Sequence, residues 1–166
     1  MGQLMAILIA VVWAGAVQAD GLSPGAKIAF FGISFIDTST EGAYNGIRED
    51  ETARLAMLKD YVRDQFTERG FTLLPLDTVE TEMNRVASVA DCNFCDVIMA
   101  RKLEADYSMV GEVQKVSNLI LAMNLVVRDA AEGQHVRGIS VDIRGNNDKS
   151  WLRGMRYILK NNIFKE

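Results

Sequence analysis

Two cysteines in a C-x-x-C spacing are the residues that come closest to a chemical motif in this chain. They are Cys92 and Cys95. In an exported protein such a pair is free to form a disulfide. Thiol exchange needs a thiol with a depressed pKa, and the carboxylates of Asp91 and Asp96 beside the pair oppose thiolate formation. We predict a structural disulfide with a local role, and a thiol-redox function stays open as the alternative.

The spacing of these residues does not favour the binding of a cofactor. Covalent haem attachment needs a histidine directly after the second cysteine, and position 96 is aspartate. A closed zinc site needs four ligands, whereas His135 is the single histidine of the chain. We therefore predict no cofactor and no metal site.

The acidic segment 37–51 is the second candidate, and it contains Asp37 and Glu41. Hard cations such as calcium favour several carboxylate oxygens, but the spacing matches no EF-hand loop. Acidic side chains are also favourable at the N-terminus of a following helix. Because loops that leave a strand often contact ligands, this segment is our candidate for a contacting loop, and a small-ligand or metal carrier remains a further alternative.

Catalytic signatures are missing from the sequence. It contains no nucleophile elbow, metalloprotease motif, phosphate-binding loop or paired-carboxylate pattern, so we predict that the protein is not an enzyme. Arginine and tryptophan are enriched at interface hot spots, and the interaction candidates are Arg144, Trp151, Arg153 and Arg156. The alternative is that Trp151 belongs to the core and the arginines are solvated.

Hydrophobic periodicity predicts the elements that must position these residues. An apolar run at 27–36 is typical of a buried strand, and a three- and four-residue repeat predicts a helix from about 55 that stops at Gly70. Further predicted elements are a strand at 71–76, helices at 77–89 and 96–103, strands at 107–116, 119–128 and 135–144, and a helix after Asn147.

This order of elements predicts the topology. A strand, a helix and a strand favour parallel pairing through a right-handed crossover, and the last three strands favour an antiparallel meander. Ser117 and Asn118 are the predicted two-residue turn, which sets Val110 opposite Leu125 and mixes polar and apolar residues on both faces. The predicted fold class is α/β (α+β), a single domain with a mixed five-stranded sheet flanked by helices.

The first 19 residues carry no charged side chain and end in small residues before Asp20. They predict a secretory signal peptide at 1–19, a domain at 20–166 and a periplasmic, exported protein that is not integral to the membrane. The formal net charge of the chain is −4, which argues against nucleic acid as a partner.

Several short blocks carry a family resemblance. They are A-D-Y at 105–107, V-G-E-V at 110–113, L-V-V-R-D-A at 125–130 and E-G-Q at 132–134. In these blocks the chain resembles the N-terminal α/β domain of TolB and its TolB-like and CsgG-like envelope relatives. Through C-N-F-C at 92–95 and D-I-R-G-N-N-D-K-S-W-L-R-G at 142–154 it also resembles a small secreted proteobacterial family of unknown function.

The resemblance implies a non-catalytic accessory or protein-interaction domain whose partner is an unknown envelope or periplasmic protein. It implies service to envelope assembly or to a periplasmic quinoprotein oxidation system. The β-propeller that follows this domain in TolB has no counterpart within the 166 residues, so none of its partner binding is carried over. Fold analogy alone is a weak warrant for function.

Overall fold

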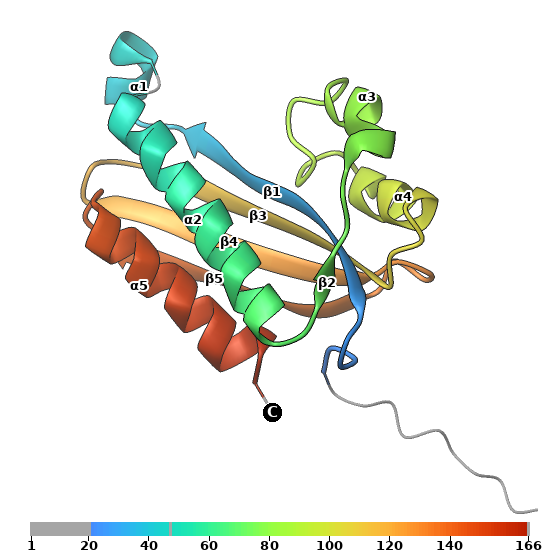
Figure 1. Ribbon diagram of the computed structural model, residues 1–166. Coiled ribbons are helices and arrows are strands. Elements are labelled where there is room, and N and C mark those ends of the chain that lie inside the picture. Colours follow the sequence, from blue (N-terminus) through green and yellow to red (C-terminus); the bar gives the residue numbers. More distant parts are fainter. Residues whose placement is uncertain (1–20, 47, 166) are drawn as a thin grey trace, which may run out of the picture.

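A computed structural model describes residues 21–46 and 48–165, and the predicted signal peptide lies outside these residues. Five strands form one sheet in the order β2-β1-β3-β4-β5 (Figure 1). Among the described residues, no helix is both long and apolar enough to cross a membrane.

The sheet is mixed, as the sequence predicts. Its strands are β1 (Lys27–Asp37), β2 (Thr72–Leu73), β3 (Tyr107–Lys115), β4 (Ile120–Asp129) and β5 (His135–Arg144). Strand β1 pairs parallel to both β2 and β3, while β3, β4 and β5 form an antiparallel meander. The predicted fold class is therefore confirmed, although β2 is much shorter than the run at 71–76 indicates.

Two helices cover one face of the sheet. Helix α1 (Thr40–Asn45) leads into α2 (Glu49–Glu68), and α5 (Asp148–Ile158) continues into a π-helical turn, η2 (Leu159–Ile163). Figure 1 shows α2 and α5 side by side across the strands. Their apolar stripes build the larger core, whose helical members include Leu58, Val62, Phe66, Trp151, Met155 and Ile158.

The opposite face carries shorter elements, namely η1 (Asp77–Val79), α3 (Glu80–Met83) and α4 (Cys95–Lys102). The predicted helix at 77–89 is wrong beyond its first turns. The amide of Asn84 caps α3 by donating to the Glu80 carbonyl. The chain then follows the sheet surface irregularly, where the Ser88 hydroxyl bonds to that of Ser34 on β1.

A β-bulge in β1 shifts the inward and outward alternation of its side chains by one residue. The register with β3 shifts between Phe30 and Ile33, and Gly32 lies at φ +89°, a left-handed conformation that glycine adopts without a steric penalty. Because of the extra residue, both Phe30 and Ile33 face α2 and α5.

The hairpin of β3 and β4 differs by one residue from its predicted register. Gly111 pairs with Leu125, and Val113 pairs with Met123. The turn is longer than two residues because the Ser117 hydroxyl accepts the amides of the two residues that follow Asn118. The faces are therefore cleanly split rather than mixed, and the inward side chains of β4 are fully buried: Leu121, Met123, Leu125 and Val127.

Candidate interaction surface

Strand β5 leaves a long open edge at one side of the sheet. It has ten residues and pairs only with β4 in the part of the chain that the structure describes. The opposite edge strand, β2, has only two residues. A long strand edge presents unpaired backbone groups that another chain can pair with.

The register shows which backbone groups of β5 point to the open edge. The Gly145 amide donates to the Leu119 carbonyl at 3.0 Å, just beyond the paired residues Ile120 and Arg144. Antiparallel ladders alternate between bonded and non-bonded pairs, so the residues that share the parity of Gly145 bond to β4. The backbone groups of the others point outward, and these are Gly138, Ser140, Asp142 and Arg144.

A groove of about 520 Å³ runs between this edge and α5. Ile139 and Val141 of β5 line it together with Arg153 and Tyr157 of α5. Tyr157 is 53% exposed although it is a large aromatic side chain. Asp142 and Arg144 also line it, so the groove combines apolar walls with charged side chains of both signs.

The outer face of α5 is basic in a chain whose net charge is −4. Its exposed cations are Lys149, Arg153 and Arg156, and Lys160 follows them on η2. Among residues 21–46 and 48–165, no ion pair joins any of the four to a carboxylate, whereas the nearby Asp148 is paired with Arg54. The face therefore carries uncompensated positive charge.

Of the predicted interaction candidates, Arg144 and Arg153 line the groove and Arg156 lies on the basic face. Trp151 is different, because its side chain is fully buried and stacks on Phe35 with ring centroids 5.8 Å apart. It cannot touch a partner directly, which corrects its assignment as a surface residue. Its apolar stripe position on α5 places it in the core.

The acidic segment does not form an open loop, because Asp37 and Glu41 converge on one buried lysine. The Lys115 ammonium lies 2.7 Å from Glu51 Oε1, 3.1 Å from Asp37 Oδ2 and 3.3 Å from Glu41 Oε2. Lys115 and Glu51 are buried completely or nearly so. We call Lys115, Asp37, Glu41 and Glu51 the lysine cluster.

The protonation of the lysine cluster follows from its contacts. Burial lowers the pKa of Lys115, but the ion pairs that its ammonium makes with the carboxylates of Glu51, Asp37 and Glu41 outweigh burial and leave that pKa above its usual value. Burial raises the pKa of Asp37, but the hydrogen bonds that Ser39 donates and the Lys115 charge bring it below its usual value. Lys115 and Asp37 thus keep one another charged.

The lysine cluster extends into a network that ties the segments at this end of the sheet. Asn146, in the turn before α5, donates to Glu51 Oε1 at 2.6 Å. The side-chain oxygen of Asn146, Oδ1, accepts hydrogen bonds from Trp151 Nε1 at 3.0 Å and from Arg54 Nη1 at 3.1 Å. Asp37 and Glu41, the predicted loop candidates, therefore belong to a network that holds β1, α2, β3 and α5 together.

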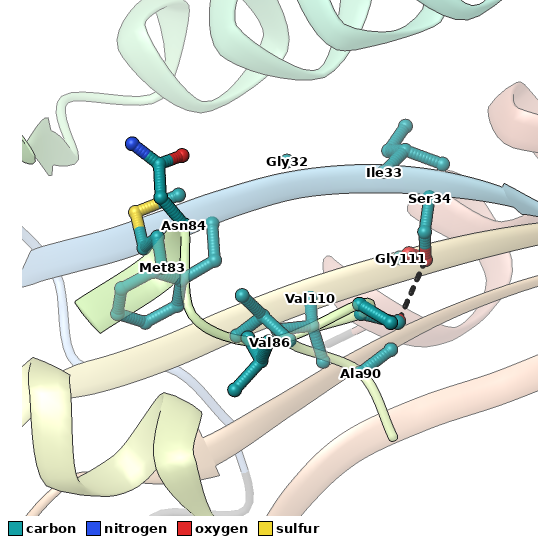
Figure 2. Close-up of a pocket in the computed structure, with 13 residues that line it drawn as sticks. Gly32, Ile33, Ser34, Met83, Asn84, Val86, Ala90, Val110 and Gly111 are labelled. Carbon is teal, nitrogen blue, oxygen red and sulfur yellow. Dashed lines mark hydrogen bonds between the residues drawn. The ribbon is translucent and has the colours of Figure 1, made fainter. Parts of the chain in front are cut away.

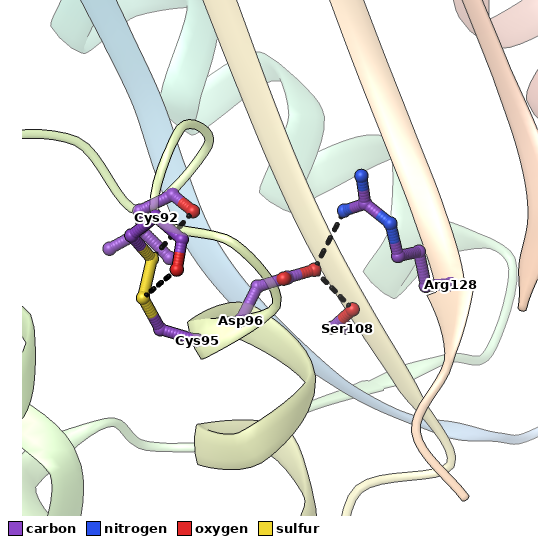
Figure 3. The surroundings of a disulfide bond; sticks show 6 residues. Cys92, Cys95, Asp96, Ser108 and Arg128 are labelled. Carbon is purple, nitrogen blue, oxygen red and sulfur yellow. Dashed lines mark hydrogen bonds and ion pairs between the residues drawn. A yellow bond between two sulfur atoms is a disulfide. The ribbon is translucent and has the colours of Figure 1, made fainter. Parts of the chain in front are cut away.

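Cys92 and Cys95 form a disulfide at the start of α4, on the face of the sheet away from α5 (Figure 3). The next residue, Asp96, is buried and accepts from Arg128 Nη1 at 2.9 Å and from Ser108 Oγ at 2.8 Å. Its charge is thereby compensated. Between the cysteines, Phe94 adopts φ +71° and is 54% exposed, an unusual conformation for a bulky residue.

A small pocket of about 190 Å³ lies where the irregular segment 84–91 crosses the β-bulge (Figure 2). Gly32, Val110 and Gly111 form its floor, and Asn84 and Val86 lie at its other side. Pockets that enclose a drug-sized ligand begin at about 300 Å³, so this one is suited to a few atoms only.

Sequence reasoning missed Lys115, Asn146 and Tyr157. A signal for Lys115 was present, because it has the parity of Met109 and Val113, whose side chains are buried. With the correct register the lysine falls on the core side, where it must be paired.

A family model, DUF3280, described as "Protein of unknown function (DUF2380)", matches residues 26–163 of this chain. The chain belongs to this family. The DUF3280 match spans the sheet, the lysine cluster, the disulfide and α5, so all the features described here lie within the family domain. No curated protein matches the chain.

Several solved bacterial structures are similar to the chain. The LpoB C-terminal domain from Salmonella enterica is 16% identical with a TM-score of 0.52, and the match covers 77% of this chain and 89% of that one. Lipoprotein GNA1162 from Neisseria meningitidis is 19% identical with a TM-score of 0.51, with coverage of 79% and 90%. TolB from Acinetobacter baumannii is 10% identical with a TM-score of 0.43, with coverage of 86% and 30%. The matches to the LpoB domain and to lipoprotein GNA1162 show a shared fold.

Proposed function

We propose that this domain is a non-catalytic accessory protein of the periplasm that binds another envelope protein through the side formed by β5 and α5. The observation that carries the proposal is the open edge of β5 beside the unpaired cations of α5. The fold shared with the LpoB domain and lipoprotein GNA1162 supports an envelope setting. Envelope assembly and a periplasmic quinoprotein oxidation system are the two settings that fit the sequence resemblance.

Affinity capture tests the proposal. The exported protein is tagged and recovered from envelope extract as wild type, as an Arg153→Glu/Arg156→Glu double variant and as an Arg85→Glu control. Arg85 is an exposed arginine on the segment after α3, away from α5. We expect one specific protein with the wild type and the control and its loss with the double variant. Equal recovery of the envelope protein with all three baits would mean that the basic face takes no part in binding it.

Thiol chemistry remains the competing function because the disulfide lies at the start of α4, where a helix N-terminus favours a thiolate. A Cys92→Ser/Cys95→Ser variant separates the two. Our proposal expects it to retain the captured protein. Loss of capture and of in vivo activity in a variant that still folds would favour thiol exchange instead.

A further inference from the structure

Resting on the proposed function, we propose that an extended acidic segment of the partner protein adds to β5 as a sixth strand. Its backbone pairs with the outward groups of β5. Its groove-facing side chains are apolar beside Tyr157 and acidic beside Arg153, and Arg156 adds positive charge on the exposed face of α5.

The backbone requirement comes first. Gly138, Ser140 and Asp142 direct amides and carbonyls to the open edge of a ten-residue strand. Arg144 adds only its amide, because its carbonyl accepts Ser150 Oγ at 2.7 Å. An incoming strand satisfies these groups with main-chain hydrogen bonds, and this is a recurring mode of peptide recognition. Neither a lipid surface nor a folded globular face offers a matching row of donors and acceptors.

The groove supplies the side-chain requirement. Strand side chains alternate, so every second residue of an added strand faces α5 and meets Ile139, Val141 or Tyr157. The close approach of α5 to β5 depends on Gly154, since a Cβ there would lie 2.6 Å from Ile143 Cγ2. The wall of the groove is therefore fixed by packing before any partner arrives, which lowers the ordering cost of binding.

The positive charge beside β5 decides between a second copy of the chain and an acidic segment as the strand that pairs with this edge. In a pair of copies joined edge to edge at β5, the two α5 helices would lie beside the same junction. Their eight exposed cations would then face one another, since each copy contributes Lys149, Arg153, Arg156 and Lys160. Like charges brought together at an interface cost several kcal/mol, so a second copy is disfavoured and an acidic segment is favoured.

Synthetic peptides test the mode of binding on the purified protein. The probe is a ten-residue peptide with glutamates at both ends and alternating valine and threonine between them. Its control has lysines in place of the glutamates. We expect the glutamate peptide to bind at least about tenfold more tightly at low salt, because complementary charge favours it. The Arg153→Glu/Arg156→Glu variant should reverse this preference, and equal affinities in both proteins would overturn the charge assignment.

Backbone N-methylation tests strand addition itself. Two further glutamate peptides carry N-methyl groups on alternate residues, one on the odd positions and one on the even positions. Only one alternation faces β5, so we expect one peptide to lose binding and the other to retain it. Equal binding by both would overturn strand addition. In the protein, Ser140→Pro removes an outward amide, and we expect this substitution to weaken the binding of the unmethylated peptide.

Other occupants give distinct results. A dimer that forms with rising concentration and is abolished by Ser140→Pro would assign the edge to a second copy and overturn the proposal. So would binding to phosphatidylglycerol vesicles with no binding of the glutamate peptide. If the peptides fail but the Arg153→Glu/Arg156→Glu variant still loses the envelope protein, strand addition is wrong and the proposed function stands. If capture is also unchanged, both fail.

Discussion

Lysine and arginine side chains occur in two contrasting settings in this molecule. In the lysine cluster one ammonium is enclosed by three carboxylates and is shielded from solvent. On α5 and η2 four cations project into solvent, and within the described ranges none has a carboxylate partner. A buried charge must be paired wherever it occurs, whereas an exposed, unpaired set of like charges is available to a partner.

The contrast assigns the two settings to different roles. The lysine cluster joins the ends of β1 and β3 to the start of α2, and Asn146 connects it to Trp151 in α5. This end of the sheet is therefore structural, although its acidic residues are the ones that the sequence suggests as a ligand loop. On the side formed by β5 and α5, Arg153 and Arg156 pair with no carboxylate of residues 21–46 and 48–165, so this side is the candidate for binding.

Removing the buried cation should have the largest effect on stability. In Lys115→Met, Glu51 and Asp37 lose their counter-charge in a buried site, and we expect a loss of about 3–5 kcal/mol of unfolding free energy. Urea denaturation measures it. The matched control is Lys149→Met on the basic face of α5, which should change stability by less than about 0.5 kcal/mol. Equal effects of the two variants would erase the contrast between the two settings.

The link between the cluster and α5 should come next in size. Asn146→Ala leaves Trp151 Nε1 without its acceptor and removes one of the donors to Glu51. We expect a loss of about 1–3 kcal/mol, because buried polar groups left unpaired carry their desolvation cost. The measurement is again urea denaturation, and an unchanged midpoint would mean that the network does not hold α5 in place.

Charge reversal on α5 should affect binding and leave the fold intact. Arg153→Glu/Arg156→Glu should weaken partner binding by at least about tenfold, or about 1.4 kcal/mol. Its urea midpoint should stay close to that of the wild type, because both side chains are exposed. If the variant unfolds, these arginines stabilise the fold rather than bind a partner.

Acidification should produce the smallest effect, and it should destabilise the wild type more than Lys115→Met. The pKa of Asp37 and that of Glu41 are below their usual values in the folded protein. Their stabilisation is therefore present above the unfolded pKa values of about 4 and is lost as the pH falls through the folded ones.

In Lys115→Met the same carboxylates lack the ammonium, so the pKa of Asp37 and that of Glu41 should lie closer to their usual values. Unfolding free energies measured between pH 5 and 3 should thus fall more steeply for the wild type than for Lys115→Met. Parallel curves would contradict the role of Lys115.

Most of the fold could be predicted from the sequence because alternation and helical periodicity report burial directly. The buried stripe of α5, with Trp151, Met155 and Ile158, is an example. The segment 84–94 escaped prediction because its course depends on contacts with the sheet, such as the bond between Ser88 and Ser34. The hairpin register escaped because the Ser117 hydroxyl lengthens the turn by local bonds that periodicity does not report.

The candidate site was predictable only in part. Arg144 and Arg153 belong to one groove because α5 folds back beside β5, and this follows from tertiary packing rather than from residue type. Trp151 was assigned to a surface because tryptophan is enriched at interfaces, whereas its position on the apolar stripe of α5 decides its burial. Lys115 required the correct register before its burial became visible.

Hydrogen exchange of β5, with and without the captured envelope protein, tests the central claim most directly. We predict that binding slows exchange at the outward amides of Gly138, Ser140, Asp142 and Arg144, while the lysine cluster and the disulfide segment stay unchanged. Protection confined to the segment of Cys92 and Cys95, or to residues 37–51, with β5 exchanging as in the free protein, would contradict the account and move the binding surface to that segment.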